Sequence, residues 1–164
     1  MEEQKQKQYW TYRIIGSIDN FIAILFLFGI IISFTAAGFN PKLLFSLFIW
    51  LSVLLYTNLS AVFARHVMAK GNSLRYKLKE WIKVNAFVTI IYAIIVIGVI
   101  CFGLIEKSYI EQISKATSVP VFMLHNVIFI FIGCMLLLII HVLLTFHYLK
   151  QFDDRFVDTD TKQE

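Results

Sequence analysis

Asp19 is the residue of this sequence best placed to do chemistry, because it is an ionisable side chain inside an apolar stretch. A charged side chain within a bilayer is costly, so it is expected to face neighbouring helices or a watery cavity. It lies about 8 Å from Ile14 along a helix axis, which is close enough to reach back towards the membrane surface. A structural role and a functional role, such as proton relay, both fit this position.

Other polar side chains gather in the same half of each apolar stretch. Ser52, Tyr56 and Ser60, for example, are spaced by four and therefore share one helix face. Because lipid offers no hydrogen bonds, such groups should point at one another. They either join the helices or line a cavity for a small ligand, lipid headgroup or ion. The candidate cavity residues are Asp19, Asn20, Asn58, Asn85, Tyr92 and His141.

Motifs for catalysis and for metal binding are missing from the sequence. It contains no His-Glu-x-x-His segment, no glycine-flanked serine nucleophile and no phosphate-binding glycine loop. Haem held between two histidines is disfavoured, since His141 lies deep in its stretch whereas His66 lies beyond the end of another. Cys101 and Cys134 are expected at different depths, too far apart for a disulfide. We therefore predict a non-enzymatic protein without catalytic residues, metal or cofactor.

Four apolar stretches are long enough to carry these residues across a bilayer. The run from Leu43 to Ala64 has no charged residue and would be about 33 Å long as a helix, and Val84 to Ile105 matches it. Pro120 suits the first turn of a helix, so the last span is expected to begin near Val119. The predicted spans are residues 14–37, 43–64, 84–105 and 119–149.

A cleaved signal peptide is an alternative interpretation of the first stretch. Lys5, Lys7 and Arg13 would form its basic head, and the small residues around Ala36 its cleavage site. The apolar run is long for a signal core and contains Asp19, which favours a retained span.

The distribution of lysine and arginine predicts how the spans thread. Most basic residues lie at the termini or in the 65–83 loop, and only Lys42, Lys107 and Lys115 lie on the other side. Because positively charged loops resist translocation, both termini and this loop are predicted to be cytoplasmic, with the protein in the cell inner membrane. The content of 59% hydrophobic and 16% charged residues agrees with that class. The net charge of +4 then reflects topology and indicates no nucleic-acid partner.

The segment before the third span is basic and amphipathic. Leucines, Trp81 and Ile82 recur at helical spacing after Ser73, a candidate helix cap, so a short interfacial helix is predicted to lead into the span. It could rest on anionic lipid headgroups or bind an acidic protein partner. The predicted contact residues are Arg75, Lys77, Lys79 and Lys83.

The predicted architecture is an all-α, up-down four-helix membrane bundle, with a cytoplasmic segment 1–13 and an acidic cytoplasmic tail 150–164. The tail is expected to be solvated, with folding back onto the basic loop as the alternative. The small residues Gly29, Ser33 and Ala36 favour close packing within the bundle or in a homo-oligomer. The leading functional hypothesis is an accessory or scaffold subunit with the basic loop as its contact surface. The second is a small transporter or channel-like oligomer with a polar cavity facing the cytoplasm.

Overall fold

The computed structural model describes residues 2–38 and 40–157, and most of this part of the chain is helical. Its α-helices are α1 (Glu2–Ala37), α2 (Pro41–Phe63), α3 (Tyr76–Ile105), α4 (Lys107–Thr117) and α5 (Val121–Gln151). The shorter elements are a π-helical turn η1 (Ala64–Met68), a 3-10 turn η2 (Asp153–Arg155) and the strands β1 (Leu74–Arg75) and β2 (Phe156–Val157).

Helices α1, α2, α3 and α5 are each long and apolar enough to cross a membrane, which confirms the prediction of an all-α chain with four candidate spans. Helices α1 and α3 begin well before the spans predicted from hydropathy, because their charged first turns are helical too. Gly38, at a φ of 69°, ends α1, since glycine adopts this left-handed conformation without strain. The side chain of Asn40 then accepts a hydrogen bond from the Lys42 amide at 2.9 Å and caps α2.

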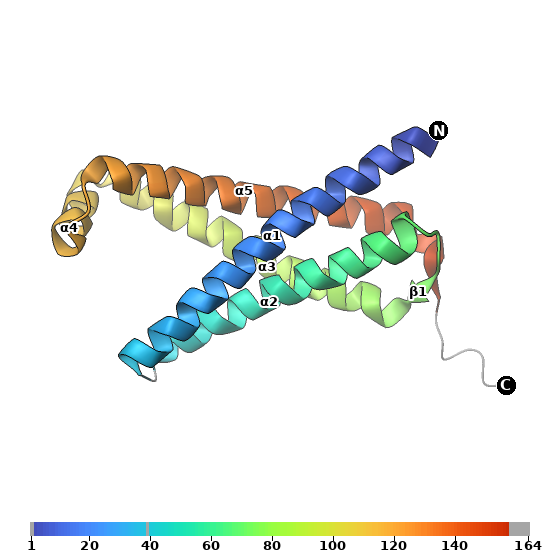
Figure 1. Cartoon of the computed structure of the whole chain (residues 1–164), viewed down its shortest axis with the longest axis horizontal. Coiled ribbons are helices and arrows are strands. Elements are labelled where there is room, and N and C mark those ends of the chain that lie inside the picture. Colours follow the sequence, from blue (N-terminus) through green and yellow to red (C-terminus); the bar gives the residue numbers. More distant parts are fainter. Residues whose placement is uncertain (1, 39, 158–164) are drawn as a thin grey trace.

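The four long helices form a ring of neighbours. Helix α1 packs against α2 and α5, and α3 packs against the same two helices from the other side. The start of α1, the end of α5 and β1 lie at one end of the molecule, which we call the terminal end (Figure 1). The short helix α4 and the turn between α1 and α2 lie at the opposite end, which we call the α4 end. Towards the α4 end the α1–α2 pair diverges from α3 and α5.

Burial follows this divergence. The buried residues of the long helices fall within 12–27 of α1, 49–63 of α2, 79–93 of α3 and 135–149 of α5. Among the described side chains of these helices, those nearer the α4 end are exposed or half-buried. Among the described residues the closed interior therefore lies towards the terminal end and stops short of the helix turns nearest the α4 end, and polar groups that need protein partners are expected within it.

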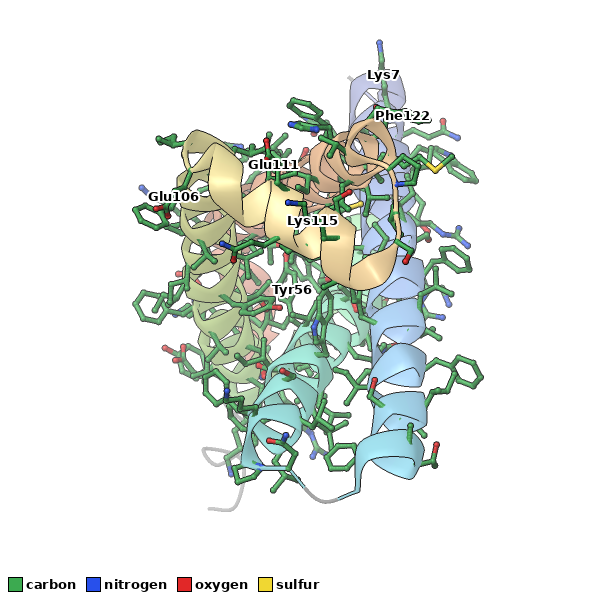
Figure 2. The ribbon with its side chains drawn as sticks, turned by 90° about the vertical axis from the view of Figure 1, so that its left-hand side faces the viewer. Lys7, Tyr56, Glu106, Glu111, Lys115 and Phe122 are labelled. Carbon is green, nitrogen blue, oxygen red and sulfur yellow. The ribbon has the colours of Figure 1, made fainter. Side chains whose placement is uncertain are left out.

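The segment between the third and fourth spans, expected as a short loop, contains helix α4. Figure 2 looks onto this end, with Glu111 and Lys115 on α4 in front of the ends of α3 and α5. Ile110 is buried, and the Ser114 hydroxyl donates a hydrogen bond to the Val119 carbonyl at 2.7 Å. Ser118 has a left-handed backbone conformation that ends the helix. This end thus carries a small covering element without an enclosed core.

The basic segment differs from the short interfacial helix predicted for it. Its residues form the strand β1 and then the first turns of α3, which continues without a break to Ile105. Arg75, and not Ser73, occupies the position before the helix. Ser73 precedes β1 and is not the cap of α3, while Gly71, at a φ of 68°, makes a turn before it.

The first part of the tail is folded back onto this segment, contrary to the expectation of a solvated tail. Strand β2 pairs in parallel with β1, with Leu74 opposite Phe156. The Phe156 ring stacks on Phe63 with centroids 5.9 Å apart, and the Arg155 guanidinium donates to the Gly71 carbonyl at 3.0 Å. Lys79 pairs with Asp153. Apolar packing and charge pairing together hold the tail at the terminal end.

Candidate functional site

An aspartate and a histidine from different helices meet inside the packed half of the molecule. The Asp19 carboxylate of α1 lies 2.9 Å from Nδ1 of His141 on α5, and the two residues are 122 positions apart in the chain. Both side chains are essentially inaccessible, at 1% and 0% exposure. An Asp–His contact at this depth holds ionisable groups where only protein partners can stabilise their charge.

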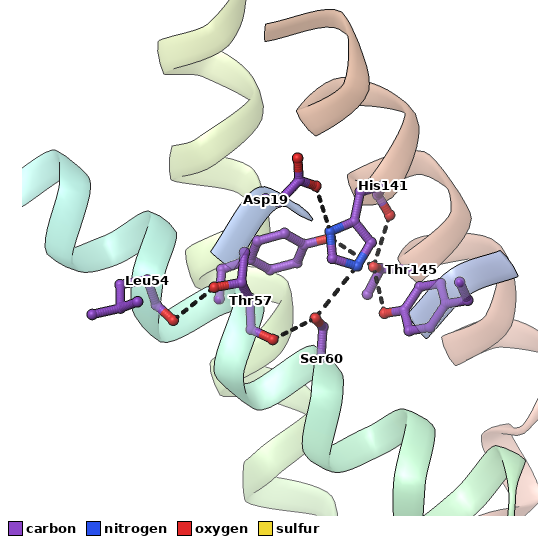
Figure 3. A network of polar contacts seen from close by, with 8 residues as sticks. Asp19, Leu54, Thr57, Ser60, His141 and Thr145 are labelled. Atoms are coloured by element: carbon purple, nitrogen blue, oxygen red, sulfur yellow. Dashed lines mark hydrogen bonds and ion pairs between the residues drawn. The ribbon is translucent and has the colours of Figure 1, made fainter. Parts of the chain in front are cut away.

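A set of hydroxyl groups fixes the position of His141. The Thr145 hydroxyl donates to the His141 carbonyl at 2.8 Å, as the dashed lines in Figure 3 show. Its only proton is then used, so it accepts from the hydroxyls of Tyr12 at 2.7 Å and Tyr56 at 2.6 Å. The rings of Tyr12 and Tyr56 lie 5.0 and 5.2 Å from the imidazole. The imidazole is therefore held from α1 and α2 as well as from its own helix.

The contact of His141 with Ser60 indicates which ring nitrogens carry protons. The Ser60 hydroxyl donates to the Thr57 carbonyl at 2.9 Å, so towards His141 Nε2, 3.4 Å away, its oxygen can only accept. A proton on Nε2 satisfies this long contact, and one on Nδ1 satisfies the bond to Asp19. With a proton on Nε2, the proton shared between Nδ1 and Asp19 can reside on either partner, and in both arrangements the pair has no net charge.

The Asp19–His141 pair also has atoms at which a proton can be added or removed. Oδ1 of Asp19 is buried and has no hydrogen-bond partner among the described residues, and neither does Oδ1 of the adjacent Asn20. A proton can be added at the free Asp19 oxygen or removed from Nε2 of His141. Either change gives the site a net charge, which a low-dielectric surrounding makes sensitive to any charged ligand nearby.

A cavity of about 180 Å³ lies beside His141, between α1 and α2 near the terminal end. Tyr12, Arg13 and Ser17 line it from α1, and Ser60 lines it from α2. Arg65 of η1 completes the opposite wall. The imidazole thus has the carboxylate on one side and an open polar space on the other.

Gly16 gives the cavity access to the imidazole. A Cβ atom at this position would lie 3.0 Å from Cε1 and 3.2 Å from Nε2 of His141, which is closer than ordinary van der Waals contact. Gly16 is itself part of the cavity wall. Only a residue without a side chain leaves both the ring and the space beside it undisturbed.

Aromatic rings separate this site from the α4 end. Phe26 of α1 stacks on Trp50 of α2 at 4.3 Å and contacts Phe131 of α5 at 5.2 Å. Each ring lies about 10 to 15 Å from the buried pair along its helix. The polar site is therefore open towards the terminal end and closed towards the other.

The other candidate cavity residues lie apart from this pair. Asn85 is buried but accepts from Ser52 at 2.9 Å, which joins α3 to α2. Tyr92 is half-buried against the Trp50 ring. Asn58 is exposed, and its amide donates to the Leu54 carbonyl of its own helix. Asn20 is half-buried next to Asp19 in sequence.

The four predicted contact residues are not one free basic surface. Lys79 is buried, pairs with Asp153 and lies over the rings of Tyr76 and Phe156. Lys83 pairs with Glu80 at 2.8 Å. Arg75 and Lys77 are exposed. Lys79 therefore binds the tail of its own chain. The sequence analysis gave this contact of the tail with the basic loop only as an alternative.

The described residues hold no group of three or more His, Cys, Asp or Glu side chains suited to a metal ion. Cys101 and Cys134 are both free thiols. His66 and His125 each contact a carbonyl of their own helix, at 3.1 and 2.9 Å. Within the described part of the chain, the chemistry available is proton exchange and hydrogen bonding around His141.

Several residues of the site were not predicted from the sequence. Tyr12 reads as an interfacial aromatic, yet it is 1% exposed. The available signal was spacing, since Tyr12, Gly16, Asp19 and Ala23 follow four-three-four steps along one face of α1 and all are buried. Their shared face predicts that Tyr12 points the same way as Asp19.

Comparison of the chain with protein-family models, with curated proteins and with solved structures found no match.

Proposed function

We propose that this chain is a non-enzymatic, multi-pass accessory protein of the cell inner membrane that binds a small ligand in a cytoplasm-facing cavity and links binding to protonation of the Asp19–His141 pair. The excess of lysine and arginine at the terminal end supports placing the termini in the cytoplasm. The cavity lining includes Arg13 near the start of α1 and Arg65 just after α2, and these parts of the two helices lie at the terminal end.

The observation that carries the proposal is the 2.9 Å contact between Asp19 and His141 beside an open polar space. Taking two charges out of water costs several kcal/mol for each ion, and a well-packed apolar pair is often equally stable. Ordinary helix association in a membrane needs only small polar contacts, each worth about 1 kcal/mol. A costly ionisable pair with a cavity next to it therefore favours a functional role over simple packing.

Proton linkage follows from the groups that face the imidazole. Asp19 and Tyr12 face it from α1, and Tyr56 and Ser60 face it from α2. Cys134 of α5 is close enough to interact with the Asp19 charge, and Arg13 and Arg65 border the cavity. A negatively charged ligand would favour the protonated imidazole, so its binding should strengthen as pH falls.

A one-sided binding site fits the structure better than a continuous channel, because the aromatic cluster of Phe26, Trp50 and Phe131 closes the path to the α4 end. Transport would require this cluster to open. The scaffold hypothesis based on the basic loop is less favoured, since Lys79 is already paired within the chain.

The proposal is tested by native mass spectrometry of protein released from nanodiscs at two pH values. Wild-type protein should retain a bound small molecule or lipid more strongly at the lower pH. Asp19→Asn keeps a hydrogen-bond acceptor for His141 but removes the charge that stabilises an imidazolium, so this pH dependence should disappear. Asp154→Asn, which removes a carboxylate charge from an exposed position outside the spans, is the matched control and should leave retention unchanged. Equal pH dependence in wild type and Asp19→Asn, or no bound species, would overturn the proposal.

A further inference from the structure

We propose that the cavity beside His141 binds a phosphate-bearing anion through the guanidinium groups of Arg13 and Arg65. This inference rests on the proposed function, since it names the ligand class of the same cavity. The chemistry is shared by a phospholipid headgroup and by a soluble phosphate compound.

The two arginines retain most of their hydrogen-bonding capacity. A guanidinium has five N–H donors. Arg13 uses one on the Tyr9 hydroxyl at 3.2 Å, and Arg65 uses one on the Ala61 carbonyl at 3.3 Å. No carboxylate pairs with either side chain among the residues that the structure describes. Two positive charges thus border one cavity without an anionic partner from the described part of the chain.

The arginines come from opposite walls of the cavity. Arg13 lines the α1 side and Arg65 the η1 side, so an anion between them can be contacted from both. Planar guanidinium groups bind phosphate oxygens in pairs, which gives both affinity and orientation. Two guanidinium groups on opposite walls suit a tetrahedral group with several oxygens better than a single-atom anion.

Two further donors complete the set. The Ser17 hydroxyl lines the cavity and has no hydrogen-bond partner in the described region, and His141 lines its inner wall. When His141 carries a proton on Nε2, that proton can be shared with an oxygen in the cavity, because the bond to Ser60 is long at 3.4 Å. The cavity therefore offers charge at its rim and directional donors further in.

The volume and depth of the cavity agree with such a group. About 180 Å³ is large enough for a phosphate with a short polar substituent but too small for a nucleotide. Arg13 and Arg65 immediately flank the first and second predicted spans, where headgroup phosphates lie. A lipid phosphate can enter from the side, and a soluble phosphate compound can enter from the aqueous mouth.

The test measures which phosphate compounds the protein retains. Full-length protein in phosphatidylcholine nanodiscs would be exposed to phosphatidylglycerol in the same bilayer, to glycerol 3-phosphate or to inorganic phosphate, with retention read by native mass spectrometry. Each arginine removed should weaken retention about tenfold, the usual worth of a hydrogen bond to a charged group. The variants are Arg13→Gln, Arg65→Gln and their combination.

The matched control is Lys70→Gln combined with Lys150→Gln, which removes the same charge from exposed positions at the same end. The control should keep wild-type retention. Arg13→Lys with Arg65→Lys should lose part of it, because lysine keeps the charge but not the paired geometry. Broadening of the phosphorus NMR signal of a probe by wild-type protein provides a readout that needs no variant to fold.

Selective retention of phosphatidylglycerol would support the inference with a lipid source, and retention of glycerol 3-phosphate or inorganic phosphate would support it with a soluble source. Equal losses in the Arg→Gln variants and in the Lys70→Gln, Lys150→Gln control would overturn the inference. So would the absence of any phosphorus-containing species on the wild-type protein. If a phosphorus-free molecule is bound with the Asp19-dependent pH response, the proposed function stands and this inference alone fails.

Discussion

At the scale of single residues, the site depends on donors and acceptors that have few alternatives. Thr145 has one proton, and its use on the His141 carbonyl makes both tyrosine hydroxyls donors. Ser60 is limited in the same way by Thr57. These bonds join α1 and α2 to the α5 backbone at His141, and the rings of Tyr12 and Tyr56 lie beside the imidazole. The imidazole therefore lies where three helices meet.

Gly16→Ala tests the close approach of α1 to the imidazole. The new Cβ would lie 3.0 Å from the ring, so His141 must shift, and we expect the free energy of unfolding to fall by about 1 to 3 kcal/mol. The pH-dependent retention of ligand should weaken as well. Thermal unfolding in detergent and native mass spectrometry measure the two effects.

Gly29→Ala on the same helix is the control. A Cβ at Gly29 has nothing within 4 Å, so the change should be neutral or stabilising by up to about 1 kcal/mol. Similar destabilisation by both variants would show that the contact between Gly16 and His141 is not responsible.

Sequence reasoning reached part of this residue-scale description. Asp19 stands out because it is charged within an apolar stretch, and His141 because it is a deep histidine. Their pairing was not predictable, since it depends on the rotation of α1 and α5 about their axes and on a contact across 122 positions. Polarity and depth in the span place Asn58 among the same candidates, although the rotation of α2 leaves it exposed.

At the scale of elements, the tail and the start of α3 act as one unit. The β1–β2 pairing is only two residues long on each strand, so it needs the Phe156–Phe63 stack and the Lys79–Asp153 pair for support.

Hydropathy predicted the long helices because each has a continuous apolar run. It did not predict the docked tail, whose two phenylalanines are separated by charged residues.

Asp153→Asn should loosen this tail. The neutral amide loses the charge of the bond to Lys79, so trypsin should cleave after Arg155 several-fold faster than in wild type. Asp154→Asn is the control, because its carboxylate has only a 3.5 Å contact with the exposed Arg155. Equal cleavage rates in the two variants would contradict a supporting role for the Lys79–Asp153 pair.

The same contact has a defined pH dependence. The hydrogen bond and charge of Lys79 hold the pKa of Asp153 below its ordinary value of 3.8. A carboxyl group with a lowered pKa contributes stability above its unfolded value and loses it as pH falls through the folded one. Tail docking should therefore stay constant from about pH 8 to about pH 5 and weaken only in stronger acid. Anisotropy of a dye attached at Val157→Cys follows this docking, and release of the tail near neutral pH would contradict the assignment.

At the scale of the whole molecule, the two ends differ in what they can do. Towards the terminal end the molecule has a closed interior with ionisable and hydrogen-bonded groups, whereas the turns of the long helices nearest the α4 end have no buried residue among their described side chains. The aromatic cluster lies between them. This asymmetry supports the proposed binding site at a single membrane face.

Labelling at Ser17 tests that arrangement most directly. In a background where Cys101 and Cys134 are alanine, Ser17→Cys places a thiol in the cavity wall and Ser118→Cys places one at the α4 end. With a membrane-impermeant maleimide on sealed vesicles of known orientation, Ser17→Cys should react only from the cytoplasmic side and Ser118→Cys only from the other. Reaction of Ser17→Cys from the periplasmic side would contradict a cavity that opens to the cytoplasm.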